Sequence, residues 1–281
     1  MIVFLNGNFV PEEQAVVSIF DRGFLYGDGL FEAIRIRCGK PFRWTQHFDR
    51  LQRGADLLKL KIPFSSNVLL SHAQELSAKN QMPEAILRLY VSRGIGERGY
   101  SPKGADKPFL AMALYPVPTI DFNKPPLRKV VVAKISVPAN HPLTAIKSTN
   151  KLIHVLARAE ADAFGADEAL LVNTDGELAE GTSCNVFWIR GETVYTPLIE
   201  SGALPGITRN LVLEICAKLS IPIREVASKP DVLFKTDGVF LSHTTMGVVE
   251  VEDVNGKRVA RSVLVQRIQQ GYREALAREV G

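Results

Sequence analysis

Two spacings of apolar residues follow one another along the chain, one typical of strands and the other typical of helices. Short apolar runs bounded by turn residues predict strands over residues 1–5, 29–37, 86–92, 109–115, 128–137, 168–173, 184–189 and 239–242. Asn6-Gly7 predicts a hairpin turn into 9–10, and a second turn at 38–40 predicts another hairpin, into 41–44.

Apolar residues three or four apart predict helices between these strands, over residues 46–61, 65–81, 151–164, 208–220 and 265–278. In the first of these helices, Phe48, Leu51, Ala55 and Leu58 fall on one face. We expect Thr45 to cap this helix, and the polar run 148–150 to cap the third.

A proline-rich stretch after residue 115 is the best candidate for a boundary between domains. It predicts a small domain at 1–115, a linker at 116–126 and a larger domain at 127–281. Because strands and helices alternate on both sides of this stretch, we expect an α/β or α+β fold in each domain.

The composition is ordinary for a globular protein, with 46% hydrophobic and 23% charged residues among 281. A net charge of +4 without a basic run does not indicate nucleic-acid binding. No apolar stretch is long enough to span a membrane, and the first residues lack the pattern of a signal peptide. Three separated cysteines and five histidines without ligand spacing predict neither a disulfide framework nor a metal site, so we expect a reduced, cytoplasmic protein.

The segment from Gly94 to Gly99 has the glycine spacing of a dinucleotide-binding turn. Such a turn must open directly into a helix, because the helix N-terminus holds the pyrophosphate. Residues 100–104 instead predict a loop, which argues against this interpretation.

Four other segments carry groups of chemical interest. Lys147 lies between an apolar residue and a helix start, where burial would favour an uncharged, nucleophilic amine. Glu180 precedes a polar turn and an apolar strand, and residues 202–209 open a helix whose first N–H groups could bind phosphate. Residues 241–247 form a hydroxyl-rich turn. Taken singly, these segments favour structural interpretations: a surface lysine, a solvated glutamate, a plain helix cap and a serine-threonine turn.

Taken together, an amine, an acid, a phosphate site and a hydroxyl loop are what pyridoxal phosphate needs from a protein. The chain resembles the class IV aminotransferases, the fold-type IV enzymes that use this cofactor, from about residue 6 to about residue 274. Besides the four segments, the resemblance rests on Asp21-Arg22-Gly23, Tyr26-Gly27-Asp28-Gly29, Phe31-Glu32 and His47-Phe48-Asp49-Arg50. It implies a small N-terminal α/β domain and a larger C-terminal pseudo-barrel domain.

The resemblance also implies roles for individual residues. Lys147 would bind the cofactor as a Schiff base and then move the proton, and Glu180 would pair with the pyridine nitrogen. The other expected cofactor-binding residues are Arg50, Leu204, Gly206, Ile207, Thr208 and Thr244. The expected substrate-binding residues are Tyr26, Phe31, Arg88, Arg98, Tyr100, His243 and Thr245. In this family the site lies between the domains and a partner subunit's loops complete it, which implies a homodimer acting on small amino and oxo acids.

The subfamily stays open between two outcomes. Phe31-Glu32, residues 180–183 and residues 203–209 are similar to the branched-chain and D-amino-acid aminotransferases, and Leu152 stands where only the latter have a leucine. Residues 92–101, 165–170 and Phe187-Trp188 are similar to the 4-amino-4-deoxychorismate lyases, which release p-aminobenzoate and pyruvate in the folate pathway. His243 departs from the asparagine of some of these lyases. We favour amino transfer over the lyase reaction, and both over a cofactor carrier without enzymatic activity.

Overall fold

The structure of the protein is a computed structural model that describes residues 1–118 and 125–281. The chain divides into two compact units. Unit 1 comprises Met1–Val117, Ile146–Asn150 and Arg278–Gly281, and unit 2 comprises Pro118–Ala145 and Lys151–Ala277. The predicted division at 116–126 differs in assigning Ile146–Asn150 and Arg278–Gly281 to the second domain, and much of that linker lies outside the described residues.

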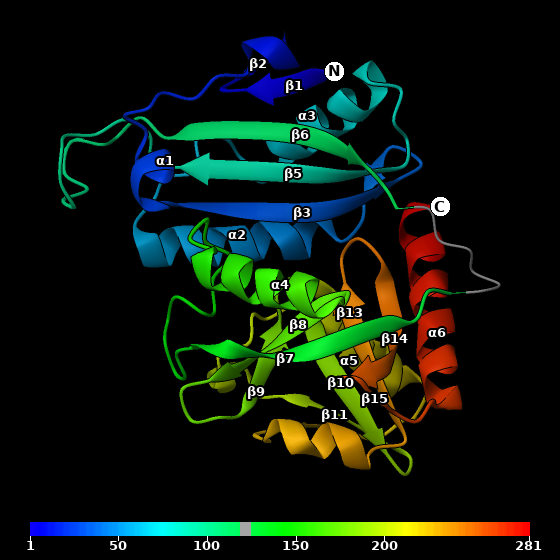
Figure 1. Cartoon of the computed structure of the whole chain (residues 1–281). Helices are drawn as coiled ribbons and strands as arrows, with labels where there is room; N and C mark the ends of the chain where they lie inside the picture. The colour runs from blue at the N-terminus through cyan, green and yellow to red at the C-terminus, as the bar shows by residue number, and fades with distance from the viewer. Residues whose placement is uncertain (119–124) are drawn as a thin grey trace. The chain divides into compact units, whose positions relative to one another are not determined.

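Unit 1 is built on a six-stranded sheet with the order β2-β1-β6-β5-β3-β4, in which all neighbours run antiparallel (Figure 1). The strands are β1 (Ile2–Leu5), β2 (Asn8–Pro11), β3 (Gly29–Arg37), β4 (Lys40–Pro41), β5 (Ala85–Ser92) and β6 (Phe109–Pro116). Its helices are η1 (Glu12–Gln14), α1 (Arg22–Tyr26), α2 (Trp44–Leu58) and α3 (Ser66–Lys79).

One face of this sheet is the core of unit 1. Alternation along β5 places Leu87, Leu89 and Val91 in the core with Leu51 of α2. Each of these side chains contributes roughly 1.5–3 kcal/mol by leaving water. The alternate positions, including Arg88 and Tyr90, point to the opposite face and are only half-buried. The pleat therefore separates a packing face from a face that carries polar and aromatic side chains.

Unit 2 is built on a nine-stranded mixed sheet with the order β12-β11-β10-β13-β14-β7-β8-β9, and β15 pairs with β14. The strands are β7 (Arg128–Val137), β8 (Glu168–Asn173), β9 (Leu178–Gly181), β10 (Asn185–Arg190), β11 (Thr193–Pro197), β12 (Ile223–Val226), β13 (Gly238–His243), β14 (Gly247–Val254) and β15 (Lys257–Arg258). The sheet curls back on itself, because β9 at one end of the order packs against β10 and β11 near the other end. This curled sheet confirms the predicted pseudo-barrel.

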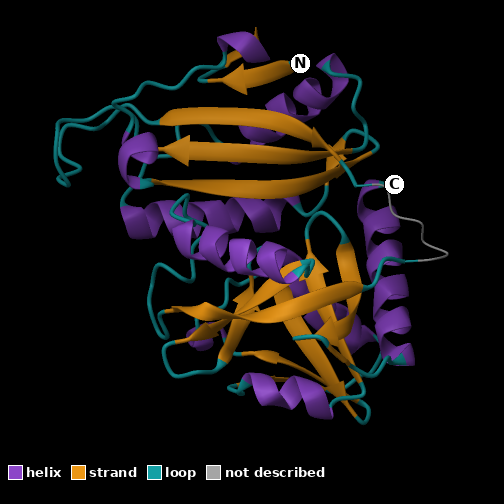
Figure 2. Cartoon of the chain, in the orientation of Figure 1, coloured by secondary structure: helices purple, strands orange, loops and turns teal. Residues whose placement is uncertain are grey.

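Helices pack around this sheet (Figure 2). They are α4 (Leu152–Phe164), η2 (Ile199–Ser201), α5 (Ile207–Lys218), η3 (Pro230–Lys235) and α6 (Val263–Val280). Helix α4 lies on β7 and β8, where the small side chains of Ala157 and Ala161 are fully buried. Helix α5 packs against β12 and β13. The other side of the sheet encloses an apolar cluster that includes Val186, Trp188 and Leu241.

Several local expectations were wrong. Thr45 lies inside α2, which begins at Trp44 after Arg43 with a φ of 54°, and no side chain caps it. No side chain caps α4 either, because residues 148–150 lie against β3 instead. The second predicted hairpin strand shrinks to Lys40–Pro41.

The loop after β5 agrees with the rejection of a dinucleotide-binding turn, because no described helix follows Gly94 before β6. Gly94 has a φ of +85°, and a Cβ there would lie 1.9 Å from the carbonyl oxygen of Lys107. This glycine is needed for a close backbone crossing, which is a structural role. Within the described part of the chain, no helix is long and apolar enough to cross a membrane.

Candidate active site

Lys147 lies on a short segment that pairs with the start of β3. The backbone N–H of Phe31 donates to the Lys147 carbonyl over 3.0 Å, and the N–H of Thr149 donates to Gly29 over 2.9 Å. The Thr149 hydroxyl donates to the Gly27 carbonyl over a further 2.9 Å. These bonds fix the backbone on both sides of the lysine, so its side chain starts from a defined place in unit 1.

Lys147 is half-buried and faces an aromatic ring. Its Nζ lies 4.7 Å from the centroid of the Phe31 ring, and the Arg88 guanidinium carbon lies 4.4 Å from the same centroid. Arg88 Nε donates to the Tyr90 hydroxyl over 3.0 Å. An amine, an aromatic ring and a guanidinium therefore gather in unit 1. The sequence predicted Lys147, Phe31 and Arg88 for this chemistry but not Tyr90.

A buried charge cluster links β3 to α2. Glu32 is 1% exposed and accepts from Arg50 Nε over 2.8 Å, from Arg50 Nη2 over 2.6 Å and pairs with His47 Nδ1 over 2.7 Å. Burial alone would raise the pKa of the Glu32 carboxyl, but Arg50 and His47 outweigh it and lower that pKa to about 2. Burial also lowers the pKa of His47. Arg50 was predicted to bind phosphate, and the structure shows that Glu32 orients its guanidinium.

Glu180 lies on β9, and each of its two carboxylate oxygens contacts another residue. Its Oε2 accepts from the backbone N–H of Leu204 over 2.9 Å, and its Oε1 lies 3.2 Å from Nε2 of His154 on α4. Glu180 is 8% exposed. A buried carboxylate needs such donors, because it cannot compensate for lost water in any other way.

The turn before α5 has the features of an anion site. Gly206 occupies the N-cap position, and no side chain caps the helix, so its first N–H groups point outward. Asn185 Nδ2 donates to the Leu204 carbonyl over 2.9 Å, and a Cβ on Gly206 would lie 2.0 Å from Asn185 Oδ1. Glycine is thus required here by contact with Asn185, and Ile207 and Thr208 follow as the first buried helical residues.

Ser242 adds an unsatisfied hydroxyl beside this turn. It lies directly across from Asn185 in the β10–β13 ladder, which places the two side chains on one face of the sheet. Ser242 is 3% exposed, and its Oγ has no hydrogen-bond partner among the described residues. A buried hydroxyl of this kind indicates that a further acceptor belongs at the site.

The hydroxyl-rich turn between β13 and β14 contains Thr244 and Thr245, both half-buried. His243 ends β13, and its ring lies with Glu168 and Cys184 so that the ligand atoms of the three are within 4.8 Å of one another. Burial lowers the pKa of His243 to about 4, which leaves its ring neutral at neutral pH.

Glu168 is the centre of this cluster and has its own donors. It accepts hydrogen bonds from the backbone N–H of Ala169 and Thr182 and from the hydroxyls of Thr182 and Ser183. The Cys184 thiol, whose pKa is raised by burial and by Glu168, lies 3.8 Å from the same carboxylate. Through these contacts Glu168 orders residues 182–184, which follow Glu180 in the chain.

Three predicted substrate residues lie on the loop after β5 or beside it. The rings of Tyr26 and Tyr100 are 5.4 Å apart, and the Tyr26 hydroxyl accepts from the N–H of Gly99 over 3.2 Å. Arg22 holds the same loop by donating to the carbonyls of Gly99, Tyr100 and Ser101. Arg98 and Tyr100 are exposed, and Tyr100 is 86% exposed.

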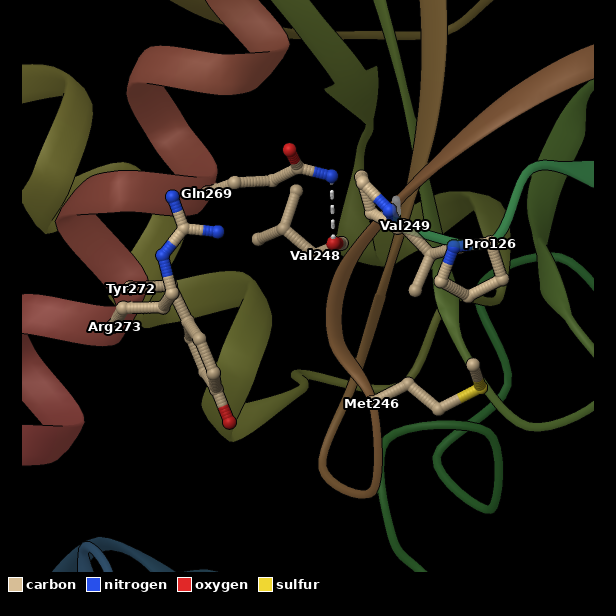
Figure 3. Close-up of a pocket in the computed structure, with 8 residues that line it drawn as sticks. Pro126, Met246, Val248, Val249, Gln269, Tyr272 and Arg273 are labelled. Carbon is tan, nitrogen blue, oxygen red and sulfur yellow. Dashed lines mark hydrogen bonds between the residues drawn. The ribbon is translucent and has the colours of Figure 1, made fainter. Parts of the chain in front are cut away.

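Two hollows lie elsewhere. Figure 3 shows the one in unit 2, where Gln269, Tyr272 and Arg273 of α6 face Val248 and Val249 of β14, and Gln269 Nε2 donates to the Val248 carbonyl. Its volume of about 30 Å³ holds about one water molecule. The other, of about 490 Å³, lies in unit 1 between residues 58–61 and 101–108. Neither is lined by Lys147 or Glu180.

The structure distributes the predicted residues over the two units. Unit 1 contains Tyr26, Phe31, Arg50, Arg88, Arg98, Tyr100 and Lys147. Unit 2 contains Glu180, Leu204, Gly206, Ile207, Thr208, His243, Thr244 and Thr245. Sequence reasoning assigned no role to His154, Glu168, Asn185 or Ser242. It noted Glu32 and His47 only as parts of motifs, although a glutamate within an apolar strand already signals a buried charge that needs a partner.

Comparisons with known proteins agree on one family. The family model described as amino-transferase class IV matches residues 29–254. A Methanocaldococcus jannaschii protein named as a branched-chain-amino-acid aminotransferase is 34% identical, covering 92% of this chain and 89% of that protein. An aminodeoxychorismate lyase of Bacillus subtilis is 30% identical, covering 90% and 88%. The solved branched-chain amino acid aminotransferase of T.th. with pyridoxamine 5'-phosphate is 27% identical with a TM-score of 0.92, covering 99% and 94%.

Replacing Glu32 by glutamine should destabilise the protein by about 3 kcal/mol at pH 7, because Arg50 stays buried without its counter-charge. The folded-state pKa of Glu32, about 2, lies below its ordinary value of 4.5. Its contribution is therefore present above pH 4.5 and is lost as the pH falls toward 2. Urea unfolding from pH 7 to pH 2 should show the two proteins converging. The exposed pair Glu75–Lys79 supplies the control, since Glu75→Gln should change stability by less than about 1 kcal/mol. A constant difference across the pH range would contradict this account.

Replacing Gly206 by alanine should displace the turn before α5, since the new Cβ would lie 2.0 Å from Asn185 Oδ1. We expect phosphate-bearing ligands such as pyridoxal phosphate to bind about tenfold more weakly or worse, a loss of about 1.4 kcal/mol. The double variant Gly206→Ala/Asn185→Ala removes the clash and should recover part of the affinity, measured by fluorescence titration. An unchanged affinity in Gly206→Ala would remove the turn from the binding site.

Proposed function

The chain belongs to the class IV aminotransferase family, and from that premise we propose that it transfers the amino group of an amino acid to a 2-oxo acid, using pyridoxal phosphate bound through Lys147. The observation that carries this proposal is the placement of Lys147, which backbone hydrogen bonds to Phe31 and Gly29 fix on β3 beside Arg88. A reactive amine next to a guanidinium suits a substrate that carries both an amino group and a carboxylate.

The residues present fit the cofactor. Its phosphate matches the uncapped start of α5, where Gly206 leaves the backbone accessible and the buried Ser242 hydroxyl is without a partner among the described residues. Its pyridine nitrogen matches Glu180, a buried carboxylate at the same turn through Leu204. Its aldehyde matches an amine, which is Lys147. When bound, pyridoxal phosphate withdraws electrons from the bond between the substrate Cα and its hydrogen.

The protein groups then have separate tasks. Lys147 Nζ, released once the substrate amine has taken its place, accepts the Cα proton and later returns it. Glu180 keeps the proton on the pyridine nitrogen, which makes the ring a stronger acceptor of electrons. Ile207 and Thr208 hold the phosphate by N–H and hydroxyl groups, and Thr244 completes that site. Arg50, which Glu32 orients, and Leu204 complete the expected cofactor contacts.

Substrate recognition is assigned to the face of the unit 1 sheet that carries Phe31 and Arg88, and to the loop around Arg98 and Tyr100. Arg88 is held over two aromatic rings, Phe31 at 4.4 Å and Tyr90 at 5.1 Å, which orients its guanidinium. Tyr26 supports the loop through its contact with Tyr100. His243 and Thr245 stay predicted substrate residues of unit 2.

A second function, the aminodeoxychorismate lyase reaction, is favoured by one observation, the likeness to the Bacillus subtilis lyase over 90% of this chain. The same lysine would remove the proton from the ring carbon that bears the amino group. The C–O bond to the enolpyruvyl group on the neighbouring ring carbon would then break, which releases pyruvate and leaves the aromatic ring of p-aminobenzoate. Arg88 and Arg98 serve either reaction, because both substrates carry carboxylates.

We also propose that the chain works as a homodimer in the cytoplasm. The exposed apolar side chains include a group between residues 16 and 25, where Phe20 and Phe24 are 62% and 66% exposed, and a group on α4, where Val155 is 59% exposed. Clusters of this kind mark interaction surfaces on soluble proteins. Free cysteines at positions 38, 184 and 216 suit a reducing compartment.

Absorbance titration of the purified protein tests the proposed reaction. We expect the visible band of bound pyridoxal phosphate to convert to the pyridoxamine band with an L- or a D-amino acid, and the responding enantiomer identifies the donor. Lys147→Ala should lose both the band and turnover, while the exposed Lys134→Ala should keep them. Formation of p-aminobenzoate and pyruvate from aminodeoxychorismate, with no response to amino acids, would replace this function by the lyase. Full turnover in Lys147→Ala would overturn both.

Analytical ultracentrifugation tests the dimer. The double variant Phe20→Glu/Phe24→Glu should dissociate into monomers and lose activity, since charges in an apolar interface are costly. Val263→Glu introduces a charge at another apolar position, 70% exposed at the start of α6, and should remain dimeric. A monomeric wild-type protein with full activity would contradict the proposal.

A further inference from the structure

His154 forms a side-chain hydrogen bond with Glu180, and no role has been given to it so far. It lies on the first turn of α4, seven residues after Lys147. Its Nε2 is 3.2 Å from Glu180 Oε1, and the two side chains are 16% and 10% exposed. The contact is therefore largely shielded from water, which strengthens it.

The other nitrogen of the ring restricts the protonation state. Nδ1 of His154 is buried and has no hydrogen-bond partner among the described residues. A carboxylate only accepts hydrogen bonds, so Nε2 must carry the proton that points at Glu180. A second proton on Nδ1 would leave a buried N–H without an acceptor, which is unfavourable. The geometry thus favours a neutral imidazole with its proton on Nε2.

Helix α4 gives this donor a fixed position. Ala157 and Ala161 are fully buried against β7 and β8, so the helix has little room to shift. The backbone N–H of Leu204 donates to the other carboxylate oxygen of Glu180, Oε2, over 2.9 Å. Two donors on two oxygens leave the carboxylate with a single orientation.

We propose that His154 is a positioning residue for Glu180 that keeps the proton on the pyridine nitrogen of the cofactor. The proposal rests on the proposed function, in which Glu180 faces that nitrogen. The His154 N–H on Oε1 and the Leu204 N–H on Oε2 hold the carboxylate in the orientation in which it accepts a hydrogen bond from the protonated pyridine nitrogen. A neutral ring also brings no positive charge next to a protonated pyridine, which a lysine or arginine at position 154 would do.

Three variants separate positioning from packing. His154→Gln keeps an N–H donor, and His154→Leu keeps similar bulk without a donor. Arg158→Leu is the control, because Arg158 lies one turn further along α4 and bonds Asp162 and the Asp167 carbonyl, not Glu180. Urea unfolding of the cofactor-free proteins shows whether each variant is folded.

The first measurement uses the cofactor-free protein. The ¹⁵N chemical shifts of the His154 imidazole should show a protonated Nε2 and an unprotonated Nδ1 at pH 7.5. Glu180→Gln should change the Nε2 shift, because the acceptor loses its charge. A doubly protonated ring, or a ring that does not respond to Glu180→Gln, would overturn the proposal whatever the enzyme catalyses.

The second measurement binds pyridoxal phosphate labelled with ¹⁵N in the ring. Wild-type protein, His154→Gln and Arg158→Leu should give the shift of a protonated pyridine, and His154→Leu should move toward the unprotonated value. Removal of the Cα proton should slow about tenfold or more in His154→Leu only. If His154→Leu folds and binds the cofactor with an unchanged ring shift, the proposal is wrong. If the wild-type protein does not bind the cofactor, the proposed function fails instead, and the imidazole shifts still decide the contact between His154 and Glu180.

Discussion

Pairing of residues 147–149 with the start of β3 is the constraint on which the proposed chemistry depends. A lysine side chain has four rotatable bonds, so its amine is useful only if the backbone beneath it is fixed. Two backbone bonds, between Phe31 and Lys147 and between Thr149 and Gly29, provide this. They also explain why residues 148–150 do not cap α4, since the Ser148 backbone pairs with Leu30 of β3 and the Thr149 hydroxyl donates to Gly27. Residues 146–150 thereby belong to unit 1 although they lie in the second half of the sequence, and α4 begins two residues after them.

Three buried carboxylates show how the same side chain acquires different roles from its donors. Glu32 meets a guanidinium and a histidine, and its depressed pKa makes it a permanent anion that fixes Arg50. Glu168 meets backbone N–H groups and hydroxyls, and it orders the turn after β9. Glu180 meets one backbone N–H and one histidine. Glu168 and Glu180 both accept on both carboxylate oxygens, but Glu168 has more donors, whereas the one backbone N–H and the one histidine at Glu180 leave lone pairs available to a cation.

Sequence periodicity predicted β3, β8 and the main helices well, because their apolar spacing reflects burial on one face. It missed β9, β11, β12, β14 and β15, which are short or lie within a curled sheet and lack clear alternation. Lys147 and Glu180 were candidates from their sequence context, and a resemblance supplied their predicted roles. Asn185, Ser242 and His154 were not, because their importance arises from contacts across strands and between a helix and a strand. Such contacts depend on register, which single-sequence patterns do not specify.

The sequence signals for the two subfamilies conflict because cofactor binding and substrate recognition are assigned to different sets of residues. The groups proposed to hold the cofactor, Glu180 and the Gly206 turn, are tied to one another through Leu204 and Asn185, so a change in one disturbs the others. Arg88 lies on the half-buried face of the unit 1 sheet, where it contacts Phe31 and Tyr90, and Arg98 lies on an exposed loop, so neither takes part in the contacts around the Gly206 turn. Substitutions at Arg88 and Arg98 can therefore change the substrate while Glu180 and the Gly206 turn stay the same. Motifs drawn from the cofactor site identify the family, and only the residues facing the substrate can separate amino transfer from elimination.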